Sequence, residues 1–448
     1  SEEVITHGAR TADSVQATTY WNDIYYDRWL DTHVGKSIDV SGNNIVFEVM
    51  NHTTNEKESL GDTLALVNQA TIDRTFKTNA VETYSLESAL GTTGAGDFSI
   101  EGVTSGSNKS TLDLNGQSGF ILSNATDLTL KDITLTGAST LVTVSNANAS
   151  VSVNNAVIDG DITGTNRFDL TTSGTSVLDD VTNADLTNSG SLALNGNFSG
   201  SITNNLGASI TSLANTISGT ISNAGDLYLT GGANSNAITG NGTTIFSNTS
   251  SNSANIENTV VNQGTFTNTG TISGAVTNSG TMTSSIENMT STIANTGNLY
   301  TTGVLAKNIT GSGATYVNNT LTLNSGGNIN GTLNMNNGTL TISSGAITSH
   351  NIGTLAGNGN ISIDINSGAT SNNVDNITLS NSSSGTLTIT ALNDIGTKPT
   401  AEGPYTYEVI SGSGVTLVLD NSIKTNSDWF SEEVITHGAR TADSVQAT

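Results

Sequence analysis

The stretch Val260–Met282 reads VVNQGTFTNTGTISGAVTNSGTM. In it, apolar residues alternate with Ser, Thr and Asn in short runs, and Gly separates one run from the next. Alternation with a period of two residues is the pattern of a half-buried β-strand, and Gly and Asn commonly end such strands. The same texture extends from about Phe98 to about Ile395, so the sequence predicts an all-β region of short, evenly spaced strands.

One motif recurs along this region: an apolar residue, a small polar residue, Gly, any residue and a second apolar residue. It starts at five positions separated by 40, 19, 55 and 57 residues, namely Ile158, Phe198, Ile217, Ile272 and Ile329. These intervals are close to multiples of about 19, near the ~20–29-residue length of known solenoid repeats. The spacing predicts a parallel β-helix, or β-solenoid, over residues 76–397, and the stretch from Phe98 to about Ile395 would hold about 16 coils at that repeat length.

A second motif, apolar-x-Asn-x-Gly-x-apolar, occurs six times, starting at Leu186, Ile221, Val260, Phe266, Val276 and Ile293. Asn and Gly are the residues that tolerate a left-handed backbone, so we expect each Asn-x-Gly to form a tight corner between strands. Stacked coils also align Asn, Ser and Thr in ladders whose side chains satisfy one another. Charged residues stacked in every coil would repel, which agrees with their scarcity between Val181 and Lys307.

The two ends of the chain differ from this region. Residues 1–75 are rich in aromatic and charged side chains and are predicted to form an N-terminal cap or connector. Pro399 and Pro404 mark the end of the regular sheets because proline cannot donate to a β-ladder. Residues 398–430 are therefore predicted to be a C-terminal β cap. Residues 431–448, SEEVITHGARTADSVQAT, repeat residues 1–18 without a mismatch, as expected of a repeating unit that starts again.

Composition limits the classes of function. Charged residues make up 11% of the 448 residues, against about 25% in typical globular domains, and the formal net charge is −25. This charge excludes a general nucleic-acid binder, which needs a basic face, and disfavours docking on an anionic membrane. The chain has no cysteine, no apolar run of membrane-spanning length and no signal-peptide core. If the protein is secreted, we expect this sequence to be its mature part.

Two stretches carry a resemblance to a known family: FSIEGVTSGSNKSTLDLNGQSGFILSNATDLTLKDITLTGA, from Phe98, and LAGNGNISIDINSGATSNNVDNITLSNSSSGTLTITALNDIG, from Leu355. They resemble the passenger domains of bacterial autotransporters and related β-helical surface adhesins. The resemblance implies a right-handed β-helix, secretion to the surface of a Gram-negative-type bacterium, and an adhesive or structural role. Where the family has a membrane β-barrel translocator after the passenger, this sequence continues with a copy of its residues 1–18, which is a departure from the expected pattern.

Proteins that resemble this β-helical fold include polysaccharide lyases and hydrolases, so clustered acidic residues are candidates for a catalytic or metal site. The acidic candidates are Asp159 with Asp161 and Asp179 with Asp180, and between Lys131 and Lys307 the only basic residue is Arg167. Such enzymes need clustered carboxylates and a cationic or basic partner. The five histidines show no metal-ligand spacing. We therefore expect no catalytic site, no cofactor and no metal, and the carboxylates are interpreted as solvated turn residues, with weak calcium binding at Asp159–Asp161 as the alternative.

The aromatic residues of the chain ends suggest a site. All three tryptophans, Trp21, Trp29 and Trp429, flank the duplicated segment, together with Tyr25 and Phe430. One interpretation is that these side chains simply pack the caps of the solenoid. The other is that they form a joint between subunits, where buried Trp and Tyr commonly dominate the energetics. The sequence leaves both interpretations open.

Three functional hypotheses follow. The first is a structural surface-fibre protein whose units, residues 1–430, join copies of themselves head to tail, either as a covalent tandem repeat or by donation of a terminal strand. The second is a monomeric autotransporter-type adhesin that binds glycans or proteins of another cell surface. The third is a polysaccharide lyase or hydrolase that uses Asp159 or Asp179. The location expected from the resemblance is secreted or at the bacterial cell surface, and the first hypothesis is preferred.

Overall fold

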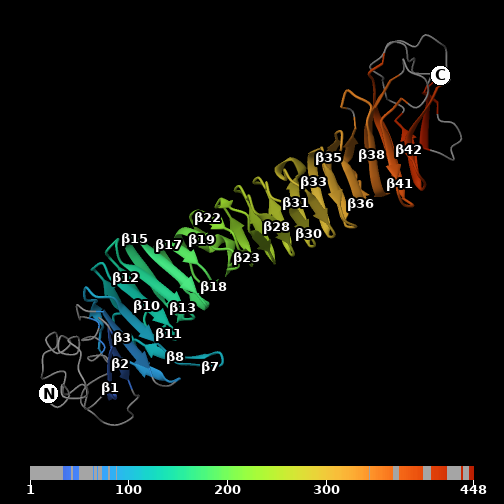
Figure 1. Cartoon of the computed structure of the whole chain (residues 1–448). Helices are drawn as coiled ribbons and strands as arrows, with labels where there is room; N and C mark the ends of the chain where they lie inside the picture. The colour runs from blue at the N-terminus through green and yellow to red at the C-terminus, as the bar shows by residue number, and fades with distance from the viewer. Residues whose placement is uncertain are drawn as a thin grey trace. The chain divides into compact units, whose positions relative to one another are not determined.

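The computed structural model describes the backbone of residues 34–41 and 44–49, the residues Leu64, Asn68, 73–78, 81–86, 88–342, 344–366, 373–396 and 405–420, and the backbone of 435–436 and 443–447. The chain forms two compact units. Unit 1 comprises Ser1–Tyr228 and Asn236–Gly242, and unit 2 comprises Leu229–Ser235 and Thr243–Thr448. Each unit is a parallel β-solenoid in which strands of successive coils lie side by side (Figure 1).

Each coil of unit 1 contributes a strand to three parallel sheets. The first sheet contains β3 (Asp73–Thr78), β6 (Phe98–Glu101), β10 (Asp127–Lys131), β13 (Ser150–Asn154), β15 (Asp161–Ser173), β17 (Val181–Asn188), β19 (Phe198–Asn204), β22 (Ile221–Asn223) and β25 (Ile238–Thr239). The second contains β4 (Thr83–Ser85), β8 (Asn108–Asp113), β11 (Ile133–Thr136), β14 (Val157–Ile158), β16 (Thr175–Leu178), β18 (Ser191–Leu194) and β20 (Ser209–Ser212). The third contains β5 (Gly91–Thr92), β9 (Phe120–Leu122), β12 (Thr140–Val144), the first residues of β15, β17 and β19, and β21 (Ile217–Ser218).

Strands of the N-terminal end of unit 1 depart from this parallel arrangement. There β1 (Val34–Ser41) pairs antiparallel with β2 (Asn44–Val49), which pairs in parallel with β3. A short antiparallel hairpin joins β7 (Thr104–Ser105) to β8. Further along the chain, the one-turn 3₁₀ helix η1 (Ala214–Thr216) follows β20, and the strand β23 (Asp226–Leu229) follows β22.

Unit 2 also has three parallel sheets. The first contains β24 (Gly232–Asn234), β27 (Thr249–Asn252), β29 (Thr265–Asn268), β31 (Thr281–Ser285), β33 (Asn298–Leu305), β35 (Ala314–Leu323), β36 (Asn328–Asn334) and β38 (Ser349–Ala356). The second contains β26 (Thr243–Phe246), β28 (Thr259–Asn262), β30 (Val276–Asn278), β32 (Ile293–Asn295), β34 (Asn308–Thr310), the first residues of β36 and β38, β40 (Asn376–Leu379) and β42 (Tyr405–Ser411). The third contains the last residues of β33 and β35, then β37 (Thr339–Thr341), β39 (Gly359–Ile365), β41 (Gly385–Asp394) and β43 (Val415–Leu419).

The coils are shortest in the central part of the chain. Hydrogen-bonded residues at equivalent positions are 16 residues apart at Thr172 and Asn188, but 23 apart at Asp127 and Ser150. In unit 2 the step between Asn358 and Thr386 is 28 residues. The two units together contain about 13 turns. The β-solenoid prediction is thus confirmed, but 16 coils was too many because the coils at both ends are longer than 19 residues. The right-handed sense and the two caps stay predictions.

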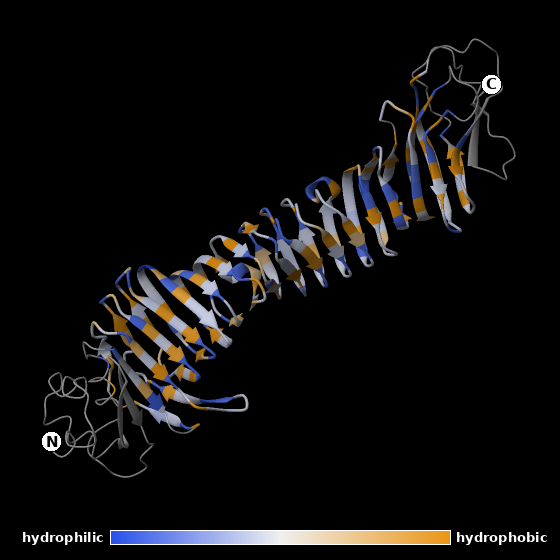
Figure 2. Cartoon of the chain, viewed as in Figure 1, coloured by the Kyte–Doolittle hydropathy of each residue, from blue (hydrophilic) through white to orange (hydrophobic). Residues whose placement is uncertain are grey.

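The core of each unit is a set of stacked apolar columns. One column of unit 1 runs through residues that are at most 1% exposed: Phe98, Leu128, Val151, Leu170, Leu186, Ile202 and Ile221. Their neighbours along each strand are polar and face outward, which gives the alternating bands of colour in Figure 2. Since each fully buried aliphatic side chain contributes roughly 1.5–3 kcal/mol, the repeated column is a main source of stability.

Asparagines at the ends of strands are buried and hydrogen-bonded to one another from coil to coil. In unit 1 the Nδ2 of Asn188 donates to the Oδ1 of Asn204, and Asn204 donates in the same way to Asn223, at 2.8 Å each. Unit 2 has two such ladders. Their members are Asn234, Asn252, Asn268 and Ser284 in one, and Asn262, Asn278 and Asn295 in the other. Buried amides that are fully paired in this way fix which strand ends stack.

The Asn-x-Gly corners exist, but the reason predicted for them was wrong. Each of the six motif asparagines is at most 2% exposed, and none is among the residues with positive φ. The left-handed asparagines lie elsewhere, for example Asn155 and Asn248. The motif Asn instead uses its side chain: the Oδ1 of Asn262 accepts from the backbone N–H of Gly264, and its Nδ2 donates to Asn278. The motif therefore serves the ladder, not a left-handed turn.

The motif glycines are required by the close approach of successive coils. Gly264, Gly280, Gly297 and Gly313 form a column, and none of them has positive φ. A Cβ on Gly264 would overlap the carbonyl oxygen of Asn248, which lies one coil earlier. In the same way, a Cβ on Gly280 would overlap the carbonyl oxygen of Gly264, and the pattern continues along the column. Backbone contact between coils thus leaves no room for a side chain here.

We predict that Asn278→Ala destabilises unit 2 by about 2–4 kcal/mol, because it removes hydrogen bonds to Asn295 and to the carbonyl oxygen of Asn298 and leaves buried partners unpaired. Equilibrium urea unfolding measures the change. Asn255→Ala is the control, since Asn255 is exposed and should tolerate the loss within about 0.5 kcal/mol. Equal effects of the two substitutions would contradict a stabilising ladder.

We also predict that Gly264→Ala is more destabilising than Gly207→Ala. At Gly264 the new methyl group overlaps backbone of the previous coil, so the stacked strands must separate. Gly207 has a φ of +80° but open space around its Cα, so alanine there meets only backbone strain of about 1–2 kcal/mol. Thermal unfolding of the two variants gives the order. A smaller effect at Gly264 would show that the coils can move apart easily.

Candidate functional site

The aromatic residues of the predicted joint, Trp21, Tyr25, Trp29, Trp429 and Phe430, lie outside the described residues. The described part of the joint is the copied segment itself, which contributes two strands, β44 (Ile435–Thr436) and β45 (Asp443–Ala447). These pair antiparallel with each other, with Ile435 opposite Ala447. The copied segment thus forms a small hairpin in unit 2.

The hairpin lies on the last strand of the second sheet of unit 2. β45 pairs antiparallel with β42 over four consecutive residue pairs, from Tyr405 opposite Ala447 to Glu408 opposite Ser444. On its other side β42 pairs in parallel with β40, and Asn376 of β40 donates to the carbonyl oxygen of Glu408 at 2.8 Å. Among the strands that the structure describes, β45 is the partner of β42 on the side opposite β40. Such edge pairing gives affinity through main-chain hydrogen bonds.

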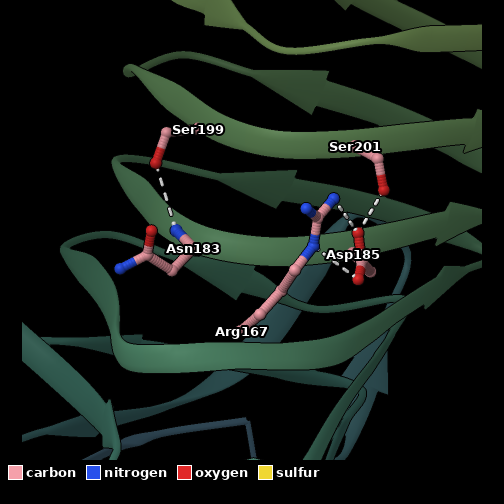
Figure 3. A network of polar contacts seen from close by, with 5 residues as sticks. All are labelled: Arg167, Asn183, Asp185, Ser199 and Ser201. Carbon is pink, nitrogen blue, oxygen red and sulfur yellow. Dashed lines mark hydrogen bonds and ion pairs between the residues drawn. The ribbon is translucent and has the colours of Figure 1, made fainter.

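Arg167, which the sequence singles out as the one possible cationic partner for catalysis, is engaged elsewhere (Figure 3). Its Nε donates to the Oδ2 of Asp185 at 2.6 Å, and a second guanidinium nitrogen contacts Oδ1, which also accepts from the hydroxyl of Ser201. The hydrogen bond from Arg167 lowers the pKa of Asp185, and the pairing raises the pKa of Arg167. Because the side chain of Arg167 is more than half exposed and that of Asp185 is partly exposed, the ion pair adds little stability.

Next to this pair, Ser199 accepts from the backbone N–H of Asn183 at 3.1 Å (Figure 3). Asn183 is one of the residues with positive φ, and its Nδ2 donates to the carbonyl oxygen of Gly164 one coil earlier. The network of Figure 3 consequently links three successive coils. It is a stacking contact on the outer face of unit 1, with its one cation neutralised.

The acidic residues considered for catalysis are partly brought together. Burial raises the pKa of Asp161, and the nearby carboxylates of Asp180 and Asp179 raise it further. Asp180 accepts from the side-chain amide of Asn197 at 3.3 Å, and Asp159 accepts from the hydroxyl of Thr136 at 2.9 Å. In the described part of the chain no group of three or more His, Asp or Glu is arranged to hold a metal ion. Asp180 and Asp159 are thus hydrogen-bond acceptors for side chains of neighbouring coils.

A buried polar cluster in unit 2 was not predicted from the sequence. It contains Asp375, which is fully buried, and His350 and Asp364, which are 1% exposed. Both oxygens of Asp375 accept backbone N–H groups at 2.7 Å, from Thr348 and from Asp364. The hydroxyl of Thr348 lies 2.9 Å from the Nε2 of His350 and 3.1 Å from Asp375, and the Nδ1 of His350 contacts the carbonyl oxygen of Gly327. The cluster holds residues 344–350 against the start of β40.

The two ionisable ends of this cluster favour neutral forms. Burial, and to a smaller extent the neighbouring Asp364, raises the pKa of Asp375 to about 6, although its hydrogen bonds oppose the shift. Burial lowers the pKa of His350. A protonated Asp375 can donate to Thr348, which then donates to the Nε2 of neutral His350. The geometry therefore suits a chain of hydrogen bonds that carries no charge.

The sequence gives little signal for this cluster. Asp364 stands in the strand pattern ISIDI, where alternation assigns Ile361, Ile363 and Ile365 to the core and Asp364 to the outside. In the structure Asp364 is buried nonetheless, and its main-chain groups pair with Asp375, eleven residues later. This contact depends on which residues form the turn between Asp364 and Asp375, and the alternation of apolar and polar residues does not predict the position of that turn.

We predict opposite effects of pH on two variants of the cluster. Because the pKa of Asp375 is raised from 3.8 in the unfolded chain to about 6 in the folded one, it contributes stability that is fully present below pH 3.8. This contribution is lost as the pH rises through about 6. The lowered pKa of His350 gives stability that is present above 6.5 and lost as pH falls. His350→Gln should therefore lose on the order of 2 kcal/mol between pH 4 and 7, since each pKa unit corresponds to about 1.4 kcal/mol.

Asp375→Asn supplies the control for this prediction. It should lower stability at every pH, because its NH₂ group faces a backbone N–H donor. In the Asp375→Asn variant, the pH dependence that remains at this cluster comes from His350, so the free energy of unfolding should decrease as the pH falls. Urea unfolding at pH 4, 5.5 and 7 measures both variants. Parallel pH profiles for the two would contradict burial of these groups as neutral species.

No protein-family model, curated protein or solved structure matches the chain. Among the described residues, no helix has the length and hydropathy needed to cross a membrane.

Proposed function

We propose that the protein is a structural component of the extracellular bacterial surface, in which β-solenoid units join in series through the copied segment. The observation that carries this proposal is the pairing of β45 with β42: residues identical to the start of the chain extend the second sheet of unit 2 beyond its last strand. A chain whose C-terminal end pairs with a copy of its own N-terminal sequence has both of the complementary surfaces that a head-to-tail joint needs.

The physical character of the solenoid supports a joint at its ends. Parallel stacking satisfies backbone groups along each sheet, so the pairing capacity that remains lies at terminal strands such as β42. The net charge of −25 opposes close approach of two copies along their flanks. Association is thereby directed to strand pairing at the ends, where main-chain hydrogen bonds compensate for the repulsion.

Extracellular location and an adhesive or scaffolding role are part of this proposal. The support is the resemblance of the two quoted stretches to autotransporter passengers, including the right-handed winding that the resemblance implies, and the β-solenoid fold itself. Stability drawn from stacked ladders needs no cysteine, and the chain has none. We propose no catalytic role and no cofactor. Glycans or proteins of a neighbouring cell surface are the proposed ligands besides copies of the chain.

The proposal predicts end-to-end assembly of the full chain. Electron microscopy and sedimentation at increasing protein concentration should show chains of particles joined at their ends. Assembly should increase when salt is raised from 20 to 300 mM, because screening shortens the range of repulsion between acidic copies from roughly 20 Å to below 10 Å.

Isolated particles at every concentration and salt would contradict the structural role and favour the monomeric adhesin. Turnover of uronate polymers that is lost in Asp179→Ala or Asp159→Ala would favour the enzyme hypothesis instead. The matched control for that assay is Asp226→Ala, which alters an exposed acidic residue on β23, outside the group formed by Asp161, Asp179 and Asp180.

A further inference from the structure

The hairpin on β42 is built entirely from duplicated residues. Its strands β44 and β45 lie within residues 431–448, and every residue that they contribute to pairing has an identical counterpart near the start of the chain. Asp13–Ala17 matches Asp443–Ala447, and Ile5–Thr6 matches Ile435–Thr436. Two segments of identical sequence, Asp443–Ala447 and Asp13–Ala17, could therefore pair with the same edge of β42.

We propose that residues Asp13–Ala17 of a second copy bind β42 as an antiparallel strand in the register that β45 holds. This deepens the proposed function and rests on it, since it assigns the two partners of the joint. In this register Glu408 lies opposite Ser14 of the second copy, and Tyr407 lies opposite Val15, as Ser444 and Val445 do in the single chain. One acceptor strand thus recognises the starting segment of the next unit.

Two physical reasons favour the same register for both segments. Main-chain hydrogen bonds depend on strand direction and pairing, which a segment of identical sequence reproduces. Register is fixed by which side chains face the core, and Tyr407 is 1% exposed, so a slip by one residue would exchange the inner and outer faces of the donor. Since donor and acceptor are different parts of the chain, repetition of this contact gives an open series and not a closed dimer.

The segment in the same chain competes with the segment of a second copy. β45 is tethered to β42 through the same polypeptide, which gives it an effective concentration in the millimolar range. Exchange therefore requires β45 to leave. A variant in which β45 cannot pair should assemble more readily than the natural chain, while its starting segment stays unchanged.

The first test uses matched proline pairs in the two copies. Successive N–H groups of a strand point to opposite sides, so two adjacent prolines remove at least one donor that faces β42. Ser444→Pro with Val445→Pro should increase end-to-end assembly at least tenfold relative to the natural chain. Adding Ser14→Pro with Val15→Pro should abolish that assembly. Circular dichroism should be the same for all three proteins, because the substituted positions lie outside residues 73–420, which hold the parallel strands of the solenoid.

The second test measures the register, and a chain without cysteine makes it specific. A chain carrying Ser444→Pro, Val445→Pro and Glu408→Cys is mixed with a chain carrying Ser14→Cys under mild oxidation. Disulfide heterodimers should form at least tenfold more than with Gln16→Cys, which lies two residues out of register. At that offset the Cβ atoms are about 7–8 Å apart, too far for a disulfide.

Each outcome decides between the inference and the function on which it rests. Assembly that persists with both proline pairs, or equal disulfide yields with Ser14→Cys and Gln16→Cys, overturns the inference but leaves assembly in series intact. Absence of end-to-end assembly in every variant overturns both. Loss of assembly with the second proline pair, together with in-register disulfides, supports the assignment of residues 13–17 as the donor strand.

Discussion

The hydrogen-bonded approach of one coil to the next is the constraint on which the rest of the structure depends. Adjacent parallel strands lie about 4.8 Å apart, so each residue contacts the equivalent residue of the next coil. A residue type that recurs at one position must therefore be able to pack against, or hydrogen-bond with, a copy of itself. Asparagine does so because its amide donates to one neighbour and accepts from the other, as Asn278 does between Asn262 and Asn295. Glycine does so at positions such as Gly264, where backbone of the previous coil fills the space.

The same constraint explains the shortage of charge. A carboxylate repeated in every coil would face its copies at strand spacing. At Asp161, burial raises the pKa, and the charges of Asp180 and Asp179 raise it further. Where charges are stacked favourably they alternate in sign: Glu101 lies between Lys77 and Lys131 on successive strands. In the proposed function, the excess negative charge opposes contact between the flanks of neighbouring molecules and leaves the ends for association.

The final coils of unit 2 differ from the central ones in both length and polarity. Their longer loops enclose ionisable groups, with His350 and Asp375 linked through Thr348. Asp375 directly precedes β40, which pairs with β42, the strand that carries the copied segment. Buried, hydrogen-bonded polar groups of this kind specify one arrangement of their neighbours at some cost in stability. Such a cluster suits a place where a terminal edge must be held in one register.

Three features could be predicted from the sequence by itself because they depend on local patterns. Period-2 alternation predicts short strands, the spacing of the motifs that start at Ile158 predicts a solenoid, and Asn-x-Gly predicts corners between strands. Tertiary structure decided the rest. Burial of Asn262, the contact of Asp364 with Asp375, and the seating of Asp443–Ala447 on β42 depend on which residues stack. Coil length varies along the chain, and it decides which residues of successive coils stack on one another. Alternation within a single strand does not predict the length of the coil, so it does not predict these contacts.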